Sequence, residues 1–204
     1  MQYVAISGTV GAGKTTLLRR LTERLGARAA FHEERPDENP YINIYYADTR
    51  RWSFHSQAAF LTQYFDDFLS PEQAAGKDFY FFDRAVTENL IIAKYRLNQG
   101  DLDKTEYAML EKLATGISRL MPPIDKYIYL DIPPRIIEDH MLSRRREYED
   151  SLDLFYIYEV KELYDEWAQT LPKDRTLVLD MTEEYDLDAI LRFLSTRPQQ
   201  IPDR

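Results

Sequence analysis

The segment GTVGAGKT at residues 8–15 constrains this chain more than any other feature, because it directly follows a strand-like apolar run at residues 3–6. A G-x-x-x-x-G-K-T pattern between a strand and a helix is typical of a phosphate-binding loop, in which backbone N–H groups and the helix N-terminus surround phosphate oxygens. We expect Lys14 to reach the outer phosphates and the hydroxyl of Thr15 to ligate Mg²⁺. The predicted nucleotide-binding residues are Gly8, Thr9, Val10, Gly11, Ala12, Gly13, Lys14, Thr15 and Thr16.

The composition narrows the class of protein. The chain has 204 residues, 44% of them hydrophobic, so we expect a single domain over residues 1–196 and a loose tail at 197–204. No run approaches the roughly 18 apolar residues of a membrane span, and no signal peptide is evident, which predicts a cytoplasmic protein without membrane contact. The chain has no cysteine, which excludes disulfides and thiolate metal sites. Its net charge of −9 argues against nucleic acid as a partner, so we expect a small acceptor molecule.

Four further apolar runs alternate with helical patterns, at residues 29–32, 79–82, 127–130 and 177–179. Apolar runs without polar alternation are typical of a parallel sheet covered on both faces. The predicted fold class is therefore α/β, with a five-stranded, doubly wound parallel sheet and helices on both faces. Ligands of such sheets bind beyond the carboxyl ends of the strands. This rule selects Glu33, Glu34, Asp83, Arg84, Asp131 and Asp180 as candidate site residues.

Asp83 closes the run at residues 79–82. Enzymes with a phosphate-binding loop use a carboxylate at this place to hold Mg²⁺ from the side opposite the loop. Alternatively, Asp83 caps a helix that starts near Arg84, and the two roles can coexist. A cation is unfavourable in the first turn of a helix, so we expect Arg84 to orient a carboxylate or to contact the acceptor oxygen.

Glu33 and Glu34 follow the second predicted strand, where the acceptor hydroxyl has to be presented to the phosphate. Phosphoryl transfer depends mainly on positioning and charge neutralisation, and a carboxylate usually accepts the proton of the hydroxyl. One of these two glutamates is our candidate general base. The alternative is a solvated acidic loop that continues through Asp37 and Glu38.

Three adjacent arginines at residues 144–146 follow a helix expected to begin near Pro134. Such neighbours repel one another unless an anion joins them, so we interpret them as a lid that closes over the phosphates. The alternative is a solvated basic turn. Gln57 lies within an aromatic-rich segment of helical spacing, where it either binds a partner edge-on or bonds the protein's own backbone.

Together these motifs resemble the deoxyribonucleoside kinase family, especially its bacterial deoxyadenosine/deoxyguanosine kinase branch. The matching segments run in order along nearly the whole chain: residues 8–15, Glu34 with 37–41, 45–48, 51–54 with Gln57, 83–84, 127–130, Arg144, Arg146 and Glu149. The resemblance implies a P-loop kinase fold and ATP-dependent phosphorylation of the 5′-hydroxyl of a deoxyribonucleoside, with purines slightly favoured. It also implies Mg²⁺ as the metal, ATP and a nucleoside as small-molecule partners, and a homodimer formed through helices.

The resemblance further implies a role for each matching residue. Glu34 falls at the position of the general base, Arg84 beside the 5′-oxygen, and Asp83 toward Mg²⁺. The other positions bind substrate or phosphate. Gln57 and Asn89 are expected at the base, Tyr46 and Glu149 on the sugar 3′-hydroxyl, and Arg144 and Arg146 on the phosphates together with Lys14. His140 is expected near the donor adenine.

The sequence departs from the family pattern at five positions near the expected site. These are Arg35, inserted between Glu34 and Pro36; Ala85 in place of Ser or Thr; Asn89 in place of an aspartate in purine-preferring members; Ala93 in place of a base-stacking phenylalanine; and His140 in place of an arginine against the donor adenine. The base preference is therefore the part of the function that the sequence defines least.

Two other functions compete with a nucleoside kinase. The first is a nucleoside monophosphate kinase similar to thymidylate kinase, for which Arg35, Arg50 and Arg51 could clamp the acceptor phosphate. A glutamate at the attacking atom would repel such an anionic acceptor. The second is a regulatory module that binds ATP without transferring phosphate, and it would leave Gln57 and Tyr46 without a task.

Overall fold

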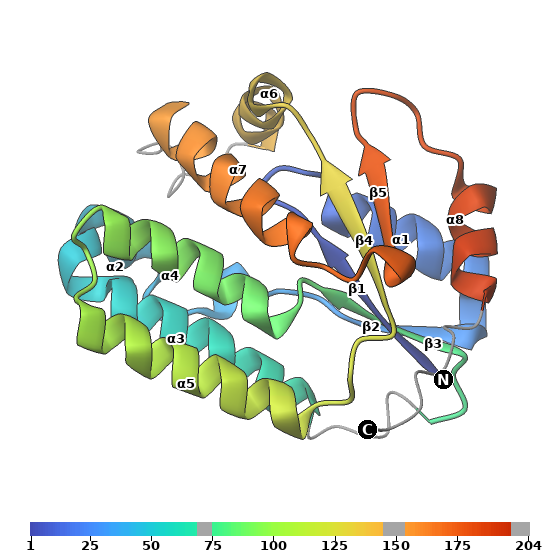
Figure 1. The fold of residues 1–204 in the computed structure, drawn as a ribbon, viewed down its shortest axis with the longest axis horizontal. Coiled ribbons are helices and arrows are strands. Elements are labelled where there is room, and N and C mark those ends of the chain that lie inside the picture. Colours follow the sequence, from blue (N-terminus) through green and yellow to red (C-terminus); the bar gives the residue numbers. More distant parts are fainter. Residues whose placement is uncertain (69–74, 145–153, 197–204) are drawn as a thin grey trace.

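A five-stranded, all-parallel sheet lies at the centre of the fold (Figure 1), as the sequence predicts. The computed structural model describes residues 1–68, 75–144 and 154–196. The strands, in the order β2-β3-β1-β4-β5, are β1 (Gln2–Ser7), β2 (Ala29–His32), β3 (Phe79–Asp83), β4 (Lys126–Asp131) and β5 (Thr176–Asp180). The phosphate-binding loop follows β1, the middle strand, so two strands of the sheet lie on each side of it.

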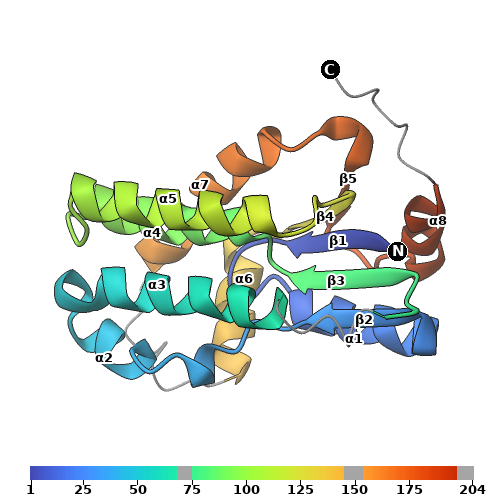
Figure 2. The same ribbon diagram turned by 90° about the horizontal axis from the view of Figure 1, so that it is seen from below.

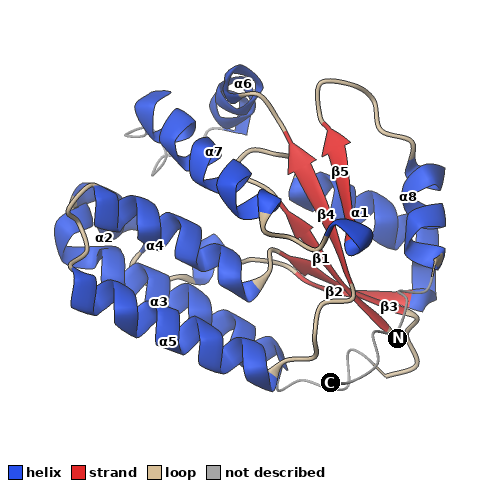
Figure 3. Ribbon diagram, viewed as in Figure 1, coloured by secondary structure: helices blue, strands red, loops and turns tan. Residues whose placement is uncertain are grey.

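Helices connect the strands and cover the sheet (Figure 3). They are α1 (Lys14–Leu25), α2 (Ile42–Ala47), α3 (Thr49–Phe68), α4 (Asn89–Asn98), α5 (Lys104–Leu120), α6 (Pro134–Arg144), α7 (Leu154–Gln169) and α8 (Leu187–Ser195). Helices α2 to α5 pack against one another as one group, which both views of the ribbon show (Figures 1 and 2). Within the described residues, no helix is long and apolar enough to cross a membrane.

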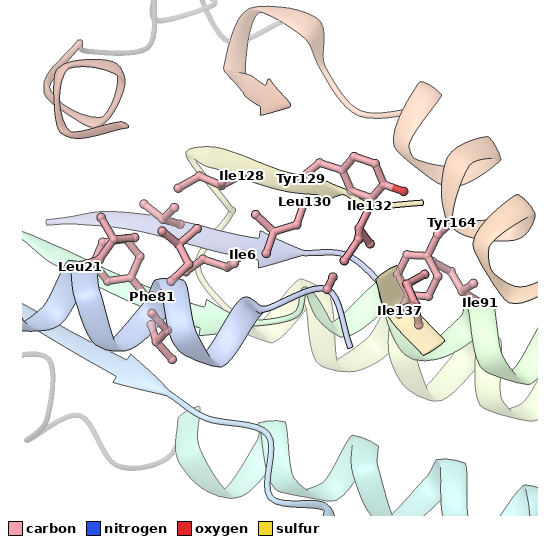
Figure 4. Packing of buried hydrophobic residues seen from close by; sticks show 14 of the residues in the cluster. Ile6, Leu21, Phe81, Ile91, Ile128, Tyr129, Leu130, Ile132, Ile137 and Tyr164 are labelled. Atoms are coloured by element: carbon pink, nitrogen blue, oxygen red, sulfur yellow. The ribbon is translucent and has the colours of Figure 1, made fainter. Parts of the chain in front are cut away.

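Two hydrophobic clusters form the core, and strand β3 contributes to both. Side chains alternate between the faces of a strand, and in β3 Phe79 and Phe81 enter one cluster whereas Tyr80 and Phe82 enter the other. The first cluster packs β1, β3 and β4 against α1, α7 and α8 (Figure 4). The second packs β3 against α3, α4 and α5. Burial of β3 on both faces explains its unbroken apolar sequence.

The chain after β3 differs from one sequence expectation. No helix begins at Arg84; a 3₁₀ turn at Val86–Glu88 comes first, and α4 follows at Asn89. Among the described residues other than glycine, Arg84 alone has a positive φ, +82°. The alternative that Asp83 caps a helix starting near Arg84 is therefore wrong, because left-handed backbone separates Asp83 from the turn.

Candidate active site

The phosphate-binding loop joins β1 to α1 and has a backbone shape that requires glycine. Gly8 has a φ of +146°, and a Cβ atom at this residue would lie 3.0 Å from the carbonyl oxygen of Leu130. The Nζ of Lys14 donates hydrogen bonds to the carbonyl oxygens of Gly8 and Thr9, at 2.8 and 2.9 Å. The ammonium group is thus held against the loop.

Lys14 is buried in a charged surrounding. Burial lowers the pKa of Lys14 to about 8, and the charge of Arg84 acts in the same direction. The carboxylates of Asp83, Glu34 and Glu88 oppose this effect. An anion placed beside Lys14 would raise its pKa again, so the lysine is suited to holding phosphate.

A cavity of about 490 Å³ opens beside the loop. Loop residues 10, 11 and 13–16 form part of its lining. The rest includes Glu33, Glu34, Pro36, Asp83, Arg84 and His140. His140 belongs to α6, and its Nδ1 lies 2.8 Å from the carbonyl oxygen of Gly11. Most of the predicted nucleotide-binding residues and the candidate acids therefore face one space, which we call the phosphate cavity.

Asp83 and Thr15 meet at the phosphate cavity and could hold a metal. The hydroxyl of Thr15 donates a hydrogen bond of 3.0 Å to Oδ2 of Asp83. Oδ1 of Asp83 is buried and has no hydrogen-bond partner among the described residues. Burial raises the pKa of Asp83, although Lys14 lowers it. A partnerless buried carboxylate oxygen beside a hydroxyl fits Mg²⁺, which prefers oxygen ligands.

Arg84 connects the groups at the centre of the site. Its Nε donates to Glu34 at 2.9 Å, and its Nη1 donates to the carbonyl oxygen of Gly8 at 3.1 Å and to the hydroxyl of Tyr164. The same Nη1 lies 3.9 Å from a carboxylate oxygen of Glu88. Left-handed backbone is strained in a residue with a side chain, and such strain often accompanies a functional position. These contacts hold the Arg84 guanidinium against Glu34 in spite of that cost.

The two glutamates after β2 have different surroundings. Glu34 faces Arg84 and is mostly buried, whereas Glu33 pairs with Arg19 at 3.6 Å at the more exposed rim of the phosphate cavity. The inserted Arg35 is held by Gln63 of α3, which accepts from the Arg35 N–H and donates to its carbonyl oxygen, at 3.3 and 2.9 Å. These two hydrogen bonds hold the backbone of the residue that directly follows Glu34.

A second cavity adjoins the first, and we call it the acceptor cavity. Its lining includes Tyr46 of α2, Gln57 of α3 and Asn89 of α4, three residues predicted to bind substrate. Aromatic rings complete much of the wall: Tyr45, Phe60, Tyr156 and Tyr164. The two cavities share Val10, Glu34, Pro36 and Arg84. The Glu34–Arg84 pair therefore lies at their junction.

Some candidate residues lie apart from both cavities. Asp131 pairs with Lys161 at 3.0 Å, and Asp180 accepts hydrogen bonds from the backbone and hydroxyl of Thr182. Ala93 is fully buried in the cluster between β3 and α5. The side chain of Arg144, together with Arg146 and Glu149 of the predicted lid, lies outside the described residues.

Three site residues escaped the sequence analysis: Gln63, Glu88 and Tyr164. Glu88 stands three residues after Ala85 and accepts the Ala85 N–H at 2.7 Å, a spacing typical of a capping glutamate. That spacing is the signal that could have identified it. Gln63 and Tyr164 lie on long helices, far in sequence from Arg35 and Arg84, the residues that they contact. No local pattern signals these contacts.

Comparison with known proteins agrees with this geometry. The model of the deoxynucleoside kinase family matches residues 4–192. A deoxyadenosine/deoxycytidine kinase of Bacillus subtilis (strain 168) is 33% identical over 187 residues, which cover 90% of this chain and 84% of the relative. A deoxyadenosine kinase of Dictyostelium discoideum is 30% identical over 172 residues, covering 84% of this chain and 68% of that protein.

Among solved structures, the deoxyadenosine kinase from M. mycoides with bound dATP superimposes with a TM-score of 0.80. The two sequences are 25% identical, and the match covers 96% of this chain and all of the other. The family model matches nearly the entire sequence, and two relatives are at least 30% identical. Together these matches identify the family of the chain. The chain belongs to the deoxynucleoside kinase family.

Proposed function

We propose that this enzyme transfers the γ-phosphoryl group of ATP to the 5′-hydroxyl of a deoxyribonucleoside, with purine nucleosides favoured. One observation carries the proposal: the Glu34–Arg84 pair lies where the phosphate cavity meets the acceptor cavity. A general base must lie within hydrogen-bond reach of the hydroxyl it deprotonates, and the hydroxyl must face the phosphate. The junction of the two cavities meets both requirements.

The residues of the junction have distinct proposed roles. Glu34 accepts the proton of the 5′-hydroxyl. Arg84 orients the Glu34 carboxylate and stabilises its charge through the hydrogen bond of 2.9 Å. Lys14 contacts the outer phosphates and offsets the negative charge of the transition state. Oxygen ligands from Thr15 and Asp83 would hold Mg²⁺, which would neutralise charge on the phosphate oxygens when bound.

The acceptor cavity is suited to a nucleoside. Gln57 is 3% exposed and supplies an amide that can donate to and accept from a base edge, while Tyr46 is proposed to hold the sugar. Both relatives described above are named as kinases of deoxyadenosine, and the one from Bacillus subtilis is named for deoxycytidine as well, so a purine is only slightly favoured. The cavity measures about 80 Å³, so its aromatic walls must move apart to admit the nucleoside.

The arginines that a monophosphate kinase would need have other partners. Arg35 pairs with Glu38 at 2.7 Å, Arg50 donates to the carbonyl oxygen of Gly100, and Arg51 stacks on Trp52. A phosphate acceptor would also bring its charge toward Glu34, at an energetic cost. A neutral hydroxyl acceptor avoids that cost, which supports the nucleoside over its monophosphate. The lid residues Arg144, Arg146 and Glu149 keep their proposed roles on phosphates and sugar.

We also propose a homodimer that forms through α5. Met109, Leu113 and Leu120 are 50%, 46% and 61% exposed and follow one another along this helix. Large apolar side chains that line one helix face in this way mark an interaction surface. Leu113→Glu should convert the dimer to a monomer, which light scattering coupled to size-exclusion chromatography would detect. A wild-type monomer at micromolar concentration would contradict the proposal.

One assay tests the proposed reaction. The purified protein receives Mg-ATP with each deoxynucleoside, each deoxynucleoside monophosphate or no acceptor, and ADP formation is measured together with the phosphorylated product. We expect turnover with deoxynucleosides, led by deoxyadenosine or deoxyguanosine. Turnover confined to monophosphates, or equal ADP formation without an acceptor, would overturn the proposal.

A further inference from the structure

Glu88 is a buried carboxylate with more contacts than its position in a turn explains. It ends the 3₁₀ turn Val86–Glu88 and is 0% exposed. Its Oε1 accepts hydrogen bonds from the hydroxyl of Ser7 at 2.6 Å and from the Ala85 N–H at 2.7 Å. Its Oε2 accepts from the Gly8 N–H at 3.3 Å and lies 3.9 Å from the Arg84 guanidinium.

Glu106 shows what a capping glutamate in this protein needs. It stands three residues after Asp103 at the start of α5 and accepts the Asp103 N–H at 2.8 Å, as Glu88 accepts the Ala85 N–H. Glu106 remains partly open to solvent, whereas Glu88 is enclosed. Burying a carboxylate is costly unless its oxygens are satisfied. The contacts of Glu88 with Ser7, Gly8 and Arg84 therefore serve something other than the cap.

The peptide groups of Gly8 link Glu88 to the catalytic centre. The Gly8 N–H donates to Glu88, and the Gly8 carbonyl oxygen accepts from Arg84 at 3.1 Å and from Lys14 at 2.8 Å. Arg84 in turn holds Glu34. A continuous set of polar contacts thus connects the first glycine of the phosphate-binding loop with the proposed general base.

We propose that Glu88 is a positioning residue for phosphoryl transfer, which fixes the phosphate-binding loop relative to Arg84 and thereby the donor relative to the base. The inference rests on the proposed function. Its physical basis is that in-line transfer depends on alignment, and a displacement of about 1 Å can cost on the order of 10²-fold in rate. The Glu88 carboxylate reaches both parts at once, since Oε2 accepts from the Gly8 N–H and lies 3.9 Å from the Arg84 guanidinium.

Glu88→Gln separates this role from capping. A glutamine can place its carbonyl oxygen where Oε1 stands and keep the bonds from Ser7 and Ala85. Its amide nitrogen would then replace Oε2, so that an N–H group would face the Gly8 N–H and the Arg84 guanidinium. The substitution therefore retains the cap and removes the contacts with the loop. Glu106→Gln is the matched control, with the same chemical change in a cap remote from both cavities.

We expect Glu88→Gln to lower kcat about 10- to 100-fold, with KM for ATP and for the nucleoside changed less than about threefold, because alignment matters most in the transition state. Glu106→Gln should leave kcat within about twofold of the wild type, and thermal melts of both variants should show a folded protein. A Glu88→Gln enzyme as active as Glu106→Gln would overturn the inference. Turnover of the wild type, measured in the same assay, tests the proposed function separately.

Ser7→Ala provides a second variant in case Glu88→Gln does not fold. It removes the hydroxyl that donates to Glu88 and retains the carboxylate. Looser positioning of Glu88 should lower kcat about three- to tenfold at nearly constant KM. An unchanged kcat in a folded Ser7→Ala enzyme would overturn the inference.

Discussion

Nε of Arg84 lies 2.9 Å from a carboxylate oxygen of Glu34, although the two residues are 50 positions apart in the chain. β2 and β3 are neighbouring parallel strands, so the residues that follow them emerge at the same edge of the sheet. The paired charges are largely shielded from solvent, where opposite charges interact more strongly than in water. The pair can therefore hold the Glu34 carboxylate in a fixed orientation next to the phosphate cavity.

Glu34→Gln should lower kcat by about 10²- to 10⁴-fold while KM for the nucleoside changes little, because a general base acts mainly in the transition state. Glu33→Gln should change kcat far less, since Glu33 pairs with Arg19 at the rim. Steady-state kinetics of both variants make the comparison. Equal, modest losses in the two variants would assign the base role to another residue, such as Asp83.

The pKa of Lys14 predicts an alkaline limit for donor binding. Lys14 has a lowered pKa of about 8 in the free enzyme, so it loses its proton as pH rises through that value. Above it, kcat/KM for ATP should decrease by up to about tenfold for each pH unit. Bound phosphates raise the pKa, so kcat at saturating ATP should stay constant to higher pH. If the profiles of kcat/KM and of kcat decline at the same pH, Lys14 is not the titrating group.

Asp83→Asn should separate stability from activity. Burial raises the pKa of Asp83 above the 3.8 of an exposed aspartate, so the native state binds this proton more tightly than the unfolded chain. The contribution of Asp83 to the free energy of unfolding therefore falls as pH rises from 3.8 through its higher folded pKa. At neutral pH the ionised carboxylate destabilises the ligand-free protein.

Replacement of this carboxylate should raise the melting temperature of the ligand-free protein by about 1–4 °C at pH 7. The kcat with Mg-ATP should fall on the order of 10²-fold through loss of a metal ligand. Differential scanning fluorimetry with and without Mg-ATP gives the first quantity, and kinetics over a Mg²⁺ titration give the second. A lower melting temperature combined with unchanged Mg²⁺ dependence would contradict both parts.

Tyr164→Phe should destabilise the protein by about 2 kcal/mol, because its buried hydroxyl accepts a hydrogen bond from the charged Arg84. Tyr185→Phe is the control. Its hydroxyl is buried and has no hydrogen-bond partner among the described residues, so its removal should cost less than about 0.5 kcal/mol. Urea denaturation measures both, and equal costs would mean that the Arg84 contact adds no stability.

The sequence predicted the parts of the site that depend on contiguous residues or on sheet topology. The loop at residues 8–15 is a local motif. Glu34, Asp83 and Arg84 lie at or within two residues of the end of a strand, so the parallel sheet brings them together. The same rule also selected Asp131 and Asp180, which pair with Lys161 of α7 and with Thr182 instead. Position after a strand thus selects an edge of the sheet but does not determine where a side chain points.

Other parts of the site depend on tertiary contacts that no local pattern reveals. In the sequence, Tyr164 looks like an ordinary apolar residue of a helix. Only the packing of α7 brings its hydroxyl to Arg84. The left-handed backbone of Arg84 was also hidden, because arginine has no preference for it. Its contacts with Glu34, Gly8 and Tyr164 outweigh the strain, and these come from three separate segments.

Asn89→Asp should alter base preference. Asn89 is 6% exposed in the wall of the acceptor cavity, where its amide can donate as well as accept, and its Nδ2 lies 3.3 Å from the carbonyl oxygen of Val86. An ionised aspartate can only accept. Where the 6-position of a purine faces residue 89, an aspartate favours the amino group of adenine over the carbonyl oxygen of guanine.

The ratio of kcat/KM for deoxyadenosine to that for deoxyguanosine should therefore rise about tenfold in Asn89→Asp, with KM for ATP within about twofold of the wild type. Asn98→Asp makes the same chemical change at the exposed end of α4 and should leave the ratio unaltered. Competition between the two nucleosides in one reaction measures the ratio directly. If the ratio stays constant in both variants, Asn89 does not face the base, and selectivity must come from Gln57 and the aromatic walls.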